Sequence, residues 1–253
     1  MDTDTTQEQV KPKQKLTAWQ RAELAVEHGS RVLLYGLPGT GKTYFGLNAG
    51  LKQAQKSYRL ICTEEMTDAD LIGTYKQSDN GVWAFSEGVG IKAWREGARL
   101  VVDEINRMNG DVESRMMALI DTTASSSWQH PDTGEIVTPN EKFSVVATMN
   151  CVPEDLAPAI LDRLIVRCEV NTPHPSAIDS LPAYLRTLAS EMTSPERADR
   201  VSLRAFVDFH EMYAKCGSID LATQVVFPEQ YSTIIGTLAV SMSQARNTET
   251  ANA

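Results

Sequence analysis

The stretch RVLLYGLPGTGKT, residues 31–43, decides the fold of this 253-residue chain. Its first five residues form a short run without a breaker, which is typical of a strand buried on both faces of a parallel sheet. The run passes directly into a glycine-rich turn, and a helical pattern follows the turn. The turn fits G-x-x-x-x-G-K-[ST] at every fixed position, between a strand and a helix as this pattern requires. The sequence therefore predicts a phosphate-binding loop on a parallel sheet.

Each residue type in this loop suits the binding of phosphate groups. Glycines let the backbone curl so that successive N–H groups point at the phosphates, and the start of the following helix adds the positive end of its dipole. We expect Lys42 to neutralise the β- and γ-phosphates and the Thr43 hydroxyl to ligate Mg²⁺. The predicted nucleotide-binding residues of the loop are Gly36, Pro38, Gly39, Thr40, Gly41, Lys42 and Thr43.

A second apolar run, LVVDE at residues 100–104, ends in two adjacent carboxylates. Asp103 lies at the end of this expected strand, where its carboxylate can join Thr43 in binding the nucleotide and Mg²⁺. Glu104 is the predicted catalytic base, which orients and deprotonates a water for in-line attack on the γ-phosphate. The alternative is that the two carboxylates are ordinary acidic residues where a strand passes into a loop. The upstream phosphate loop makes this alternative less favourable.

The buried-strand pattern recurs along the first two thirds of the chain, with helical stretches between the runs. This alternation predicts an α/β fold with a parallel sheet of about five strands flanked by helices. The expected strands are residues 31–35, 58–63, 99–104, 143–150 and 164–170, and the expected helices include 16–29, 42–54 and 111–120.

The pattern changes after residue 170, where NTPHP at residues 171–175 breaks the chain with two prolines. We predict a nucleotide-binding domain over residues 16–170, followed by a small all-helical lid domain over residues 171–243. The polar ends, residues 1–15 and 244–253, are expected to be disordered tails. Helical periodicity in the lid covers residues 176–192, 202–216, 219–226 and 229–243.

Two inserts interrupt the α/β part of the chain. Residues 73–88 carry a central D-N-G sequence between aromatic and apolar residues, which indicates a β-hairpin. Residues 125–137 carry P-D-T-G between Trp128 and an Ile-Val pair, which indicates a second hairpin.

Charge and cysteine usage narrow the class of protein. The chain has 24 Lys and Arg against 33 Asp and Glu, a formal charge of −9, so nucleic acid is not favoured as a partner. No apolar run approaches the ~20 residues of a membrane helix, and the polar N-terminus is not a secretory signal. We expect a cytoplasmic protein without membrane insertion, whose four cysteines are reduced thiols: Cys62, Cys151, Cys168 and Cys216.

Three motifs in order resemble the AAA+ ATPases: GLPGTGKT at 36–43, VVDEINR at 101–107 and ATMN at 147–150. The first two correspond to the Walker A and Walker B motifs of that family. The run DEINRM, residues 103–108, resembles the MoxR-like branch, which is related to the dynein, midasin and McrB group. The resemblance covers roughly residues 16–243, and it implies a Mg²⁺-dependent ATP hydrolase.

The resemblance also implies three roles that the residues alone do not give. Asn150 matches sensor 1, whose carboxamide holds the lytic water or the γ-phosphate by hydrogen bonding. Arg163 matches the arginine finger that reaches the nucleotide of a neighbouring subunit, with Arg167 as the second choice. Arg204 matches sensor 2, which couples the γ-phosphate to the lid. The alternatives are a strand-end turn former for the asparagine, a surface or interface salt bridge for the finger and a solvated helical arginine for sensor 2.

The leading functional hypothesis is a homo-oligomeric ring, a hexamer as in the relatives, that uses ATP hydrolysis to remodel a protein partner in the manner of a chaperone. In MoxR-like systems the partner is often a separately encoded protein with a von Willebrand factor A domain. One alternative is a nucleotide-switched assembly module in which binding matters more than turnover. Another is the motor subunit of a restriction or antiphage complex, in which GTP can replace ATP.

The resemblance gives the hairpin aromatics two possible roles. In this branch the two inserts project toward the central surface of the ring, where aromatic side chains would touch a substrate. In the alternative role they are hydrophobic staples that fix each hairpin on the core. The residues concerned are Tyr75, Trp83, Phe85 and Trp128.

Overall fold

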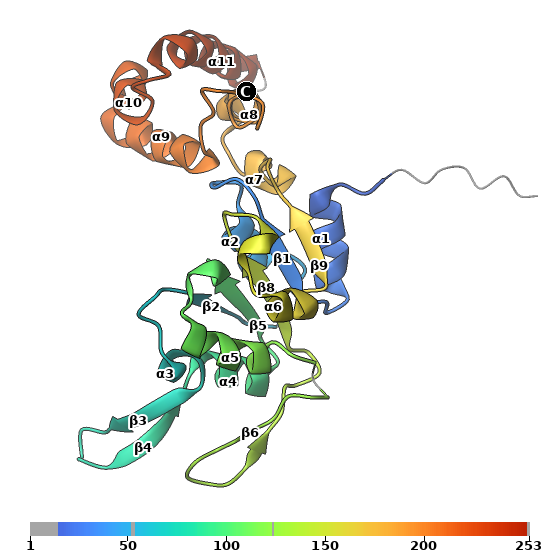
Figure 1. Cartoon of the computed structure of the whole chain (residues 1–253). Helices are drawn as coiled ribbons and strands as arrows, with labels where there is room; N and C mark the ends of the chain where they lie inside the picture. Colours follow the sequence, from blue (N-terminus) through green and yellow to red (C-terminus); the bar gives the residue numbers. More distant parts are fainter. Residues whose placement is uncertain (1–14, 52–53, 123, 252–253) are drawn as a thin grey trace, which may run out of the picture.

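The computed structural model describes residues 15–51, 54–122 and 124–251, and the described part contains one five-stranded parallel sheet (Figure 1). Every strand of this sheet lies within a stretch that the sequence predicts as a strand, give or take one residue, so the predicted parallel α/β fold is confirmed. The sheet order is β2 (Ser57–Ile61), β5 (Arg99–Asp103), β8 (Ser144–Thr148), β1 (Val32–Tyr35) and β9 (Val166–Glu169).

Helices cover both faces of the sheet, which is why its strands read as continuous apolar runs. Val32 and Leu34 of β1 pack into one hydrophobic cluster with α1 and α2, while Leu33 points to the other face. The helices of the first face are α1 (Ala18–Glu27) and α2 (Lys42–Asn48). Those that contribute to the second cluster are α3 (Asp68–Leu71), α4 (Val89–Glu96), α5 (Gly110–Leu119) and α6 (Pro158–Arg163).

Helix α2, which follows the phosphate loop, is shorter than the predicted helix over residues 42–54. It ends at Asn48, Ala49 has an extended ψ of 135°, and Gly50 adopts a left-handed φ of 57°. A glycine in this conformation turns the chain away from the helix without steric cost.

A buried arginine explains this early end. Arg99, at the start of β5, is completely buried, and its guanidinium donates to the carbonyl oxygens of Gly46 (3.2 Å), Ala49 and Gly50 (3.4 Å). Burial lowers the pKa of Arg99 to about 10, so the side chain keeps its charge at neutral pH. The cation therefore satisfies the carbonyl end of α2 and holds it on the sheet.

The chain after β9 is helical throughout its longer segments. The prediction of one helix over residues 176–192 is wrong, because the structure has two helices there. Pro182 lies between them, and it lacks the N–H that a continuous helix requires. The last helix continues to Ala251, so most of the predicted tail at 244–253 is helical. The helices are α7 (Pro175–Asp179), α8 (Ala183–Met192), α9 (Leu203–Cys216), α10 (Ile219–Val226) and α11 (Tyr231–Ala251).

These C-terminal helices have a hydrophobic cluster of their own. Phe206 and Phe209 of α9 contact Phe227, with ring centroids 5.2 and 5.7 Å apart. Figure 1 shows α8 to α11 gathered at one end of the molecule, beyond the sheet. Among the described residues, no helix is long and apolar enough to cross a bilayer. The predicted N-terminal tail, residues 1–15, lies outside the described residues except for its last residue.

Both inserts contain an antiparallel strand pair, and the two hairpins project from the end of the molecule away from α8 to α11 (Figure 1). The turns carry Gly81 (φ 78°) and Gly134 (φ 70°), where a left-handed residue is needed. The paired strands are β3 (Gly73–Gln77) with β4 (Trp83–Glu87), and β6 (Trp128–Gln129) with β7 (Ile136–Val137).

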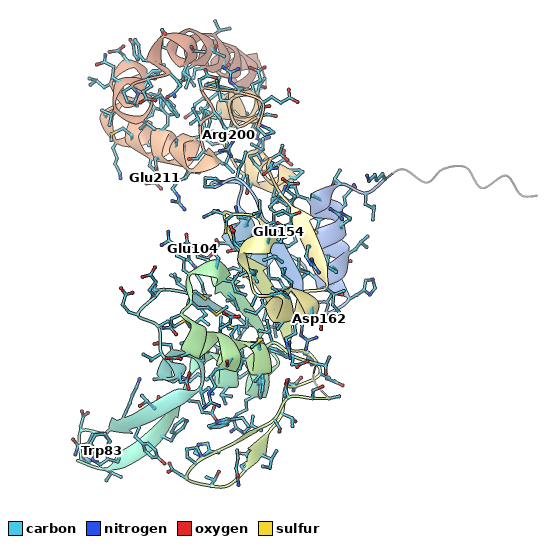
Figure 2. All side chains as sticks on the ribbon, viewed as in Figure 1. Trp83, Glu104, Glu154, Asp162, Arg200 and Glu211 are labelled. Carbon is cyan, nitrogen blue, oxygen red and sulfur yellow. The ribbon has the colours of Figure 1, made fainter. Side chains whose placement is uncertain are left out.

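A carboxylate and a pair of aromatic rings connect the two hairpins. Asp132, in the turn of the second hairpin, accepts hydrogen bonds from the Tyr75 hydroxyl (2.6 Å) and the Phe85 amide (3.3 Å) of the first. The rings of Phe85 and Trp128 lie 5.6 Å apart. Three of the four predicted aromatics therefore join hairpin to hairpin, whereas Trp83 is 64% exposed at the far tip (Figure 2).

We expect Arg99→Met to lower the free energy of unfolding by about 2–4 kcal/mol, because it leaves buried carbonyl oxygens at the end of α2 without a donor. Urea denaturation measures the change. The matched control is Arg197→Met, which removes a surface arginine paired with Asp199 (2.8 Å) and should leave stability unchanged. Equal stability of the Arg99 variant and the wild type would contradict the capping role.

Candidate nucleotide-binding site

One cavity of about 290 Å³ lies where the parallel strands end and gathers most of the predicted site residues. Strands of a parallel sheet end at the same edge, so side chains far apart in the sequence meet there. Gly36 takes part through its carbonyl oxygen, which binds Lys42. The lining residues are Pro38, Gly39, Thr40, Gly41, Lys42, Thr43, Tyr44, Arg59, Asp103, Glu104, Thr148, Asn150 and Arg204.

The loop backbone requires its glycines. The φ values of the loop are positive at Gly36 (117°), Gly39 (73°) and Gly41 (92°). Residues that have a Cβ rarely adopt these backbone conformations. A Cβ on Gly39 would also lie 2.6 Å from the Cβ of Ser202, which precedes α9. The loop therefore curls as a phosphate-binding concavity requires, with the helical region close against it.

Lys42 is held inside this loop. Its ammonium donates hydrogen bonds to the carbonyl oxygens of Gly36 (2.9 Å) and Leu37 (2.8 Å), and the residue is only 6% exposed. Burial lowers the pKa of Lys42 to about 8, although nearby Asp103 opposes part of that shift. Both hydrogen bonds go to neutral carbonyl oxygens, and within the described residues no ion pair is found for this cation, which leaves its charge for an incoming anion.

Asp103 is the most heavily bonded group of the site. One carboxylate oxygen, Oδ1, accepts from the Thr43 hydroxyl (2.9 Å) and from the Thr148 hydroxyl. The other, Oδ2, accepts from Arg59 Nε (3.0 Å) and forms an ion pair with the same guanidinium. Burial would raise the pKa of Asp103, but hydrogen bonds from Thr148, Arg59 and Thr43 outweigh it and hold the pKa below its usual value.

The pair formed by Thr43 and Asp103 fits Mg²⁺. This ion prefers hard oxygen ligands, and it is usually bound by one or two protein groups together with phosphate oxygens and waters. A hydroxyl and an ionised carboxylate 2.9 Å apart supply that donor set. Among the described residues no group of three or more His, Cys, Asp or Glu forms a metal site. The donor set therefore suits a cation that arrives with a nucleotide.

Glu104 follows the end of β5 with an unusual backbone. Its φ of 55° and ψ of 46° are left-handed, which is uncommon for a residue with a side chain and often marks a functional site. The carboxylate lies 2.6 Å from Arg107 Nε. Figure 2 shows Glu104 on the side of the sheet that faces the C-terminal helices. The predicted base thus lines the cavity while paired with an arginine.

The remaining contributions come from β8 and α9. Thr148 is the last residue of β8, Asn150 follows two residues after it, and both side chains line the cavity. Arg204 reaches the cavity from the first turn of α9. Arg200 binds the loop itself, since its Nη2 donates to the carbonyl oxygen of Pro38 (3.0 Å). These two arginines bring positive charge from the helical region to the phosphate loop.

Arg163 lies elsewhere. It ends α6 just before β9 begins, so it is at the edge of the sheet opposite the loop. Its guanidinium is paired with Asp121 (2.8 Å) and donates to the carbonyl oxygen of Ala159 (2.9 Å). Arg167 is exposed on β9 and donates to the Leu161 carbonyl oxygen (3.3 Å). The structure therefore does not bring the predicted finger to the cavity of its own chain.

Four residues at the site were not predicted from the sequence: Tyr44, Arg59, Thr148 and Arg200. Thr148 was detectable, because it is a polar residue at the end of an apolar strand run, directly before the predicted site residue Asn150 and its neighbour Met149. The only sign of Arg59 in the sequence was its charge, which interrupts an apolar run that predicts a strand. Arg200 had no signal, since its contact with Pro38 joins residues far apart in the sequence.

A second cavity, of about 370 Å³, shares residues with the first. It runs between the start of α2 and the face of α9, and its apolar lining includes Leu203 and Val207. The full lining is Gly39, Gly41, Tyr44, Ala177, Ser180, Leu203, Arg204 and Val207.

Comparison with known proteins agrees with this geometry. The AAA domain family, dynein-related subfamily, matches residues 31–164, which is more than half of the chain. Protein NorQ of Paracoccus denitrificans is 28% identical over 158 residues, which are 61% of this chain and 57% of that protein. Midasin of Dictyostelium discoideum is 28% identical over 129 residues, 51% of this chain and 2% of that protein.

The chain spans only a little over half of NorQ, so the activity of the whole relative does not transfer directly. Among solved structures, NtrX from Brucella abortus in complex with ADP is similar with a TM-score of 0.52 at 15% identity, over 78% of this chain and 48% of that one. This likeness shows the fold alone. The family match and the relatives confirm the MoxR-like resemblance, and the chain belongs to the dynein-related subfamily of the AAA domain family.

Proposed function

We propose that the chain is a MoxR-like ATPase that binds ATP with Mg²⁺ and hydrolyses it. One observation carries this proposal: Lys42, Thr43, Asp103, Glu104 and Asn150 line the same cavity. A phosphate cation, a metal-binding pair, a general base and a carboxamide are the groups that in-line phosphoryl transfer to water requires.

The phosphates would bind over the loop. Lys42 would move its hydrogen bonds from the carbonyl oxygens of Gly36 and Leu37 to the phosphate oxygens. Thr43 and Asp103 would hold Mg²⁺, which neutralises charge that develops on the phosphates during transfer. Glu104 would accept the proton of the attacking water once its carboxylate leaves Arg107.

The second cavity offers room for the base of the nucleotide. It adjoins the phosphate loop at Gly39 and Gly41, and Leu203 and Val207 give it an apolar wall. Flat aromatic groups such as purines favour such surfaces. We propose ATP as the substrate because of the family, and a phosphate-release assay with GTP tests the alternative.

The region over residues 171–243 would act as the lid. Ser202 lies against Gly39, Arg200 binds the Pro38 carbonyl oxygen, and Arg204 enters the cavity. A phosphate in the loop would therefore meet groups carried by the helices. These contacts support the assignment of Arg204 as sensor 2, and they would couple nucleotide state to the position of the lid.

The proposed ring rests on the location of Arg163. This residue lies across the sheet from its own cavity, so it would serve the cavity of a neighbouring subunit in a hexamer. In that arrangement the Asp121 partner holds the guanidinium until a nucleotide attracts it. The ring would act in the cytoplasm to remodel a protein partner, with a von Willebrand factor A protein as the proposed adaptor. The exposed Trp83 tip is a candidate contact for that partner.

One observation favours a second candidate, the nucleotide-switched assembly module. Glu104 is paired with Arg107 at 2.6 Å, and a carboxylate held in an ion pair is a weaker base. If the pair persisted with nucleotide bound, the protein would bind without turnover.

We expect Glu104→Gln to bind ATP as the wild type does and to lose hydrolysis by about 10²–10⁴-fold, because the amide keeps the shape but cannot accept the proton. Calorimetry and a phosphate-release assay measure the two effects. Glu211→Gln, an exposed change on α9, is the control and should hydrolyse normally. Turnover within a few-fold of the wild type in the Glu104 variant would place the base elsewhere.

Nucleotide affinity should fall as pH rises through about 8, the pKa of Lys42 in the empty loop. The lowered pKa means that the ammonium loses its proton in this range, while bound phosphate restores the proton by stabilising the charge. Binding at pH 8.5 should therefore take up protons, which calorimetry in buffers of different ionisation enthalpy detects. Unchanged affinity and no proton uptake would show that Lys42 does not meet the phosphates.

Mixing two inactive variants tests the ring. Arg163→Ala lacks the finger and Lys42→Ala lacks the phosphate cation, so each alone should lose almost all activity, since a finger accelerates turnover by ~10³–10⁵. At a mixed interface an intact cavity meets an intact finger, and ATPase activity should partly return. Arg115→Met, an exposed change, is the control partner. A rate that stays at the level of the separate variants would reject action between subunits.

A further inference from the structure

Arg59 is a cation at the site that the proposed mechanism does not use. It lies on β2, which pairs with β5 so that Ile61 is opposite Asp103 and Arg59 is opposite Val101. The Arg59 side chain therefore extends along the strand to reach Asp103. Its side chain is 46% exposed, whereas that of Asp103 is 7% exposed. The partly exposed guanidinium lines the cavity and forms an ion pair with the buried carboxylate of Asp103.

Asp103 needs this charge whenever no cation ligand is bound. A buried carboxylate without a cation is costly, and hydroxyl donors alone do not neutralise it. Lys42 gives its hydrogen bonds to two carbonyl oxygens, and in the described residues the ion pair found for Asp103 is with Arg59. Arg59 is thus the cation that binds Asp103 directly before any ligand arrives, while Lys42 acts on it from farther away.

The same carboxylate is the proposed partner of Mg²⁺. Its Oδ1 already accepts two hydroxyl hydrogen bonds and its Oδ2 is taken by Arg59. A hydrated divalent cation can approach only by displacing one of these donors. The hydroxyl of Thr43 has to turn its lone pairs to the metal, and the exposed Arg59 is free to leave toward solvent.

We propose that Arg59 is the resident counter-cation of Asp103 in the empty site and that the divalent cation exchanges with it when the nucleotide binds. This inference rests on the proposed function, because it assumes that Mg²⁺ and the nucleotide enter this cavity. Arg59 is then a positioning residue: it keeps Asp103 ionised and oriented, and it sets how strongly nucleotide binding depends on Mg²⁺.

The proposal predicts a specific change in Arg59→Met, which keeps the length of the side chain and removes its charge. Without Mg²⁺ the uncompensated Asp103 should repel the phosphates, so affinity falls. With saturating Mg²⁺ the metal replaces the lost charge and affinity stays close to that of the wild type. The ratio of the two affinities should therefore rise about fivefold, the size expected for a half-exposed ion pair.

Calorimetry with a non-hydrolysable ATP analogue, in EDTA and in excess Mg²⁺, measures this ratio on the full chain. Arg59→Lys keeps the charge and should restore a ratio close to that of the wild type. Arg115→Met removes an exposed arginine paired with Asp68 (3.0 Å) outside the cavity lining and should change nothing. If Arg59→Met does not fold, Arg59→Gln gives the same neutral test while keeping hydrogen-bond donors.

Two results would overturn the exchange. If both affinities stay at the wild-type values, Arg59 only supports the strand. If both affinities fall by the same factor, which also leaves the ratio unchanged, Arg59 binds phosphate directly. Failure of the proposed function looks different: the wild type itself would not bind the analogue, or Lys42→Ala would bind it equally well. Normal, Lys42-dependent binding with an unchanged ratio therefore rejects the exchange alone.

Discussion

The buried carboxylate of Asp103 is the contact on which the site depends. It accepts hydrogen bonds from Thr43 on α2, from Thr148 on β8 and from Arg59 on β2. Each partner comes from a different element, so a single group fixes the start of the loop helix against the two strands that flank β5. Because the carboxylate is buried and ionised, losing any donor is costly, and this holds the cavity in shape before a ligand binds.

Strand β5 holds the loop helix at both ends. Asp103 at the end of the strand binds Thr43 in the first turn of α2, and Arg99 at the start of the strand binds the carbonyl oxygens at the end of that helix. The helix therefore cannot slide or tilt without breaking a charged contact. This arrangement connects the stability of the core to the position of Lys42, which lies at the start of the same helix.

The central strands β1, β5 and β8 were predictable from the sequence because burial leaves apolar runs, and the partly exposed edge strands β2 and β9 keep enough apolar residues to show the same pattern. The phosphate loop and the two carboxylates were predictable because their spacing is local. The length of α2 was not, since its end is set by Arg99, about fifty residues away in the chain. The contact between the hairpins was missed for a similar reason: Asp132 reads as an ordinary turn residue, and only the fold brings it to Tyr75.

The most direct test of the account is the position of the cation. A crystal structure with a non-hydrolysable ATP analogue and Mn²⁺, whose anomalous signal locates the ion, provides it. The account predicts a cation about 2.1 Å from the Thr43 hydroxyl oxygen, beside Asp103 and bound to the phosphates. Lys42 should have left the Gly36 and Leu37 carbonyl oxygens for the phosphates. A cation elsewhere, or a nucleotide whose phosphates lie outside the loop, would contradict it.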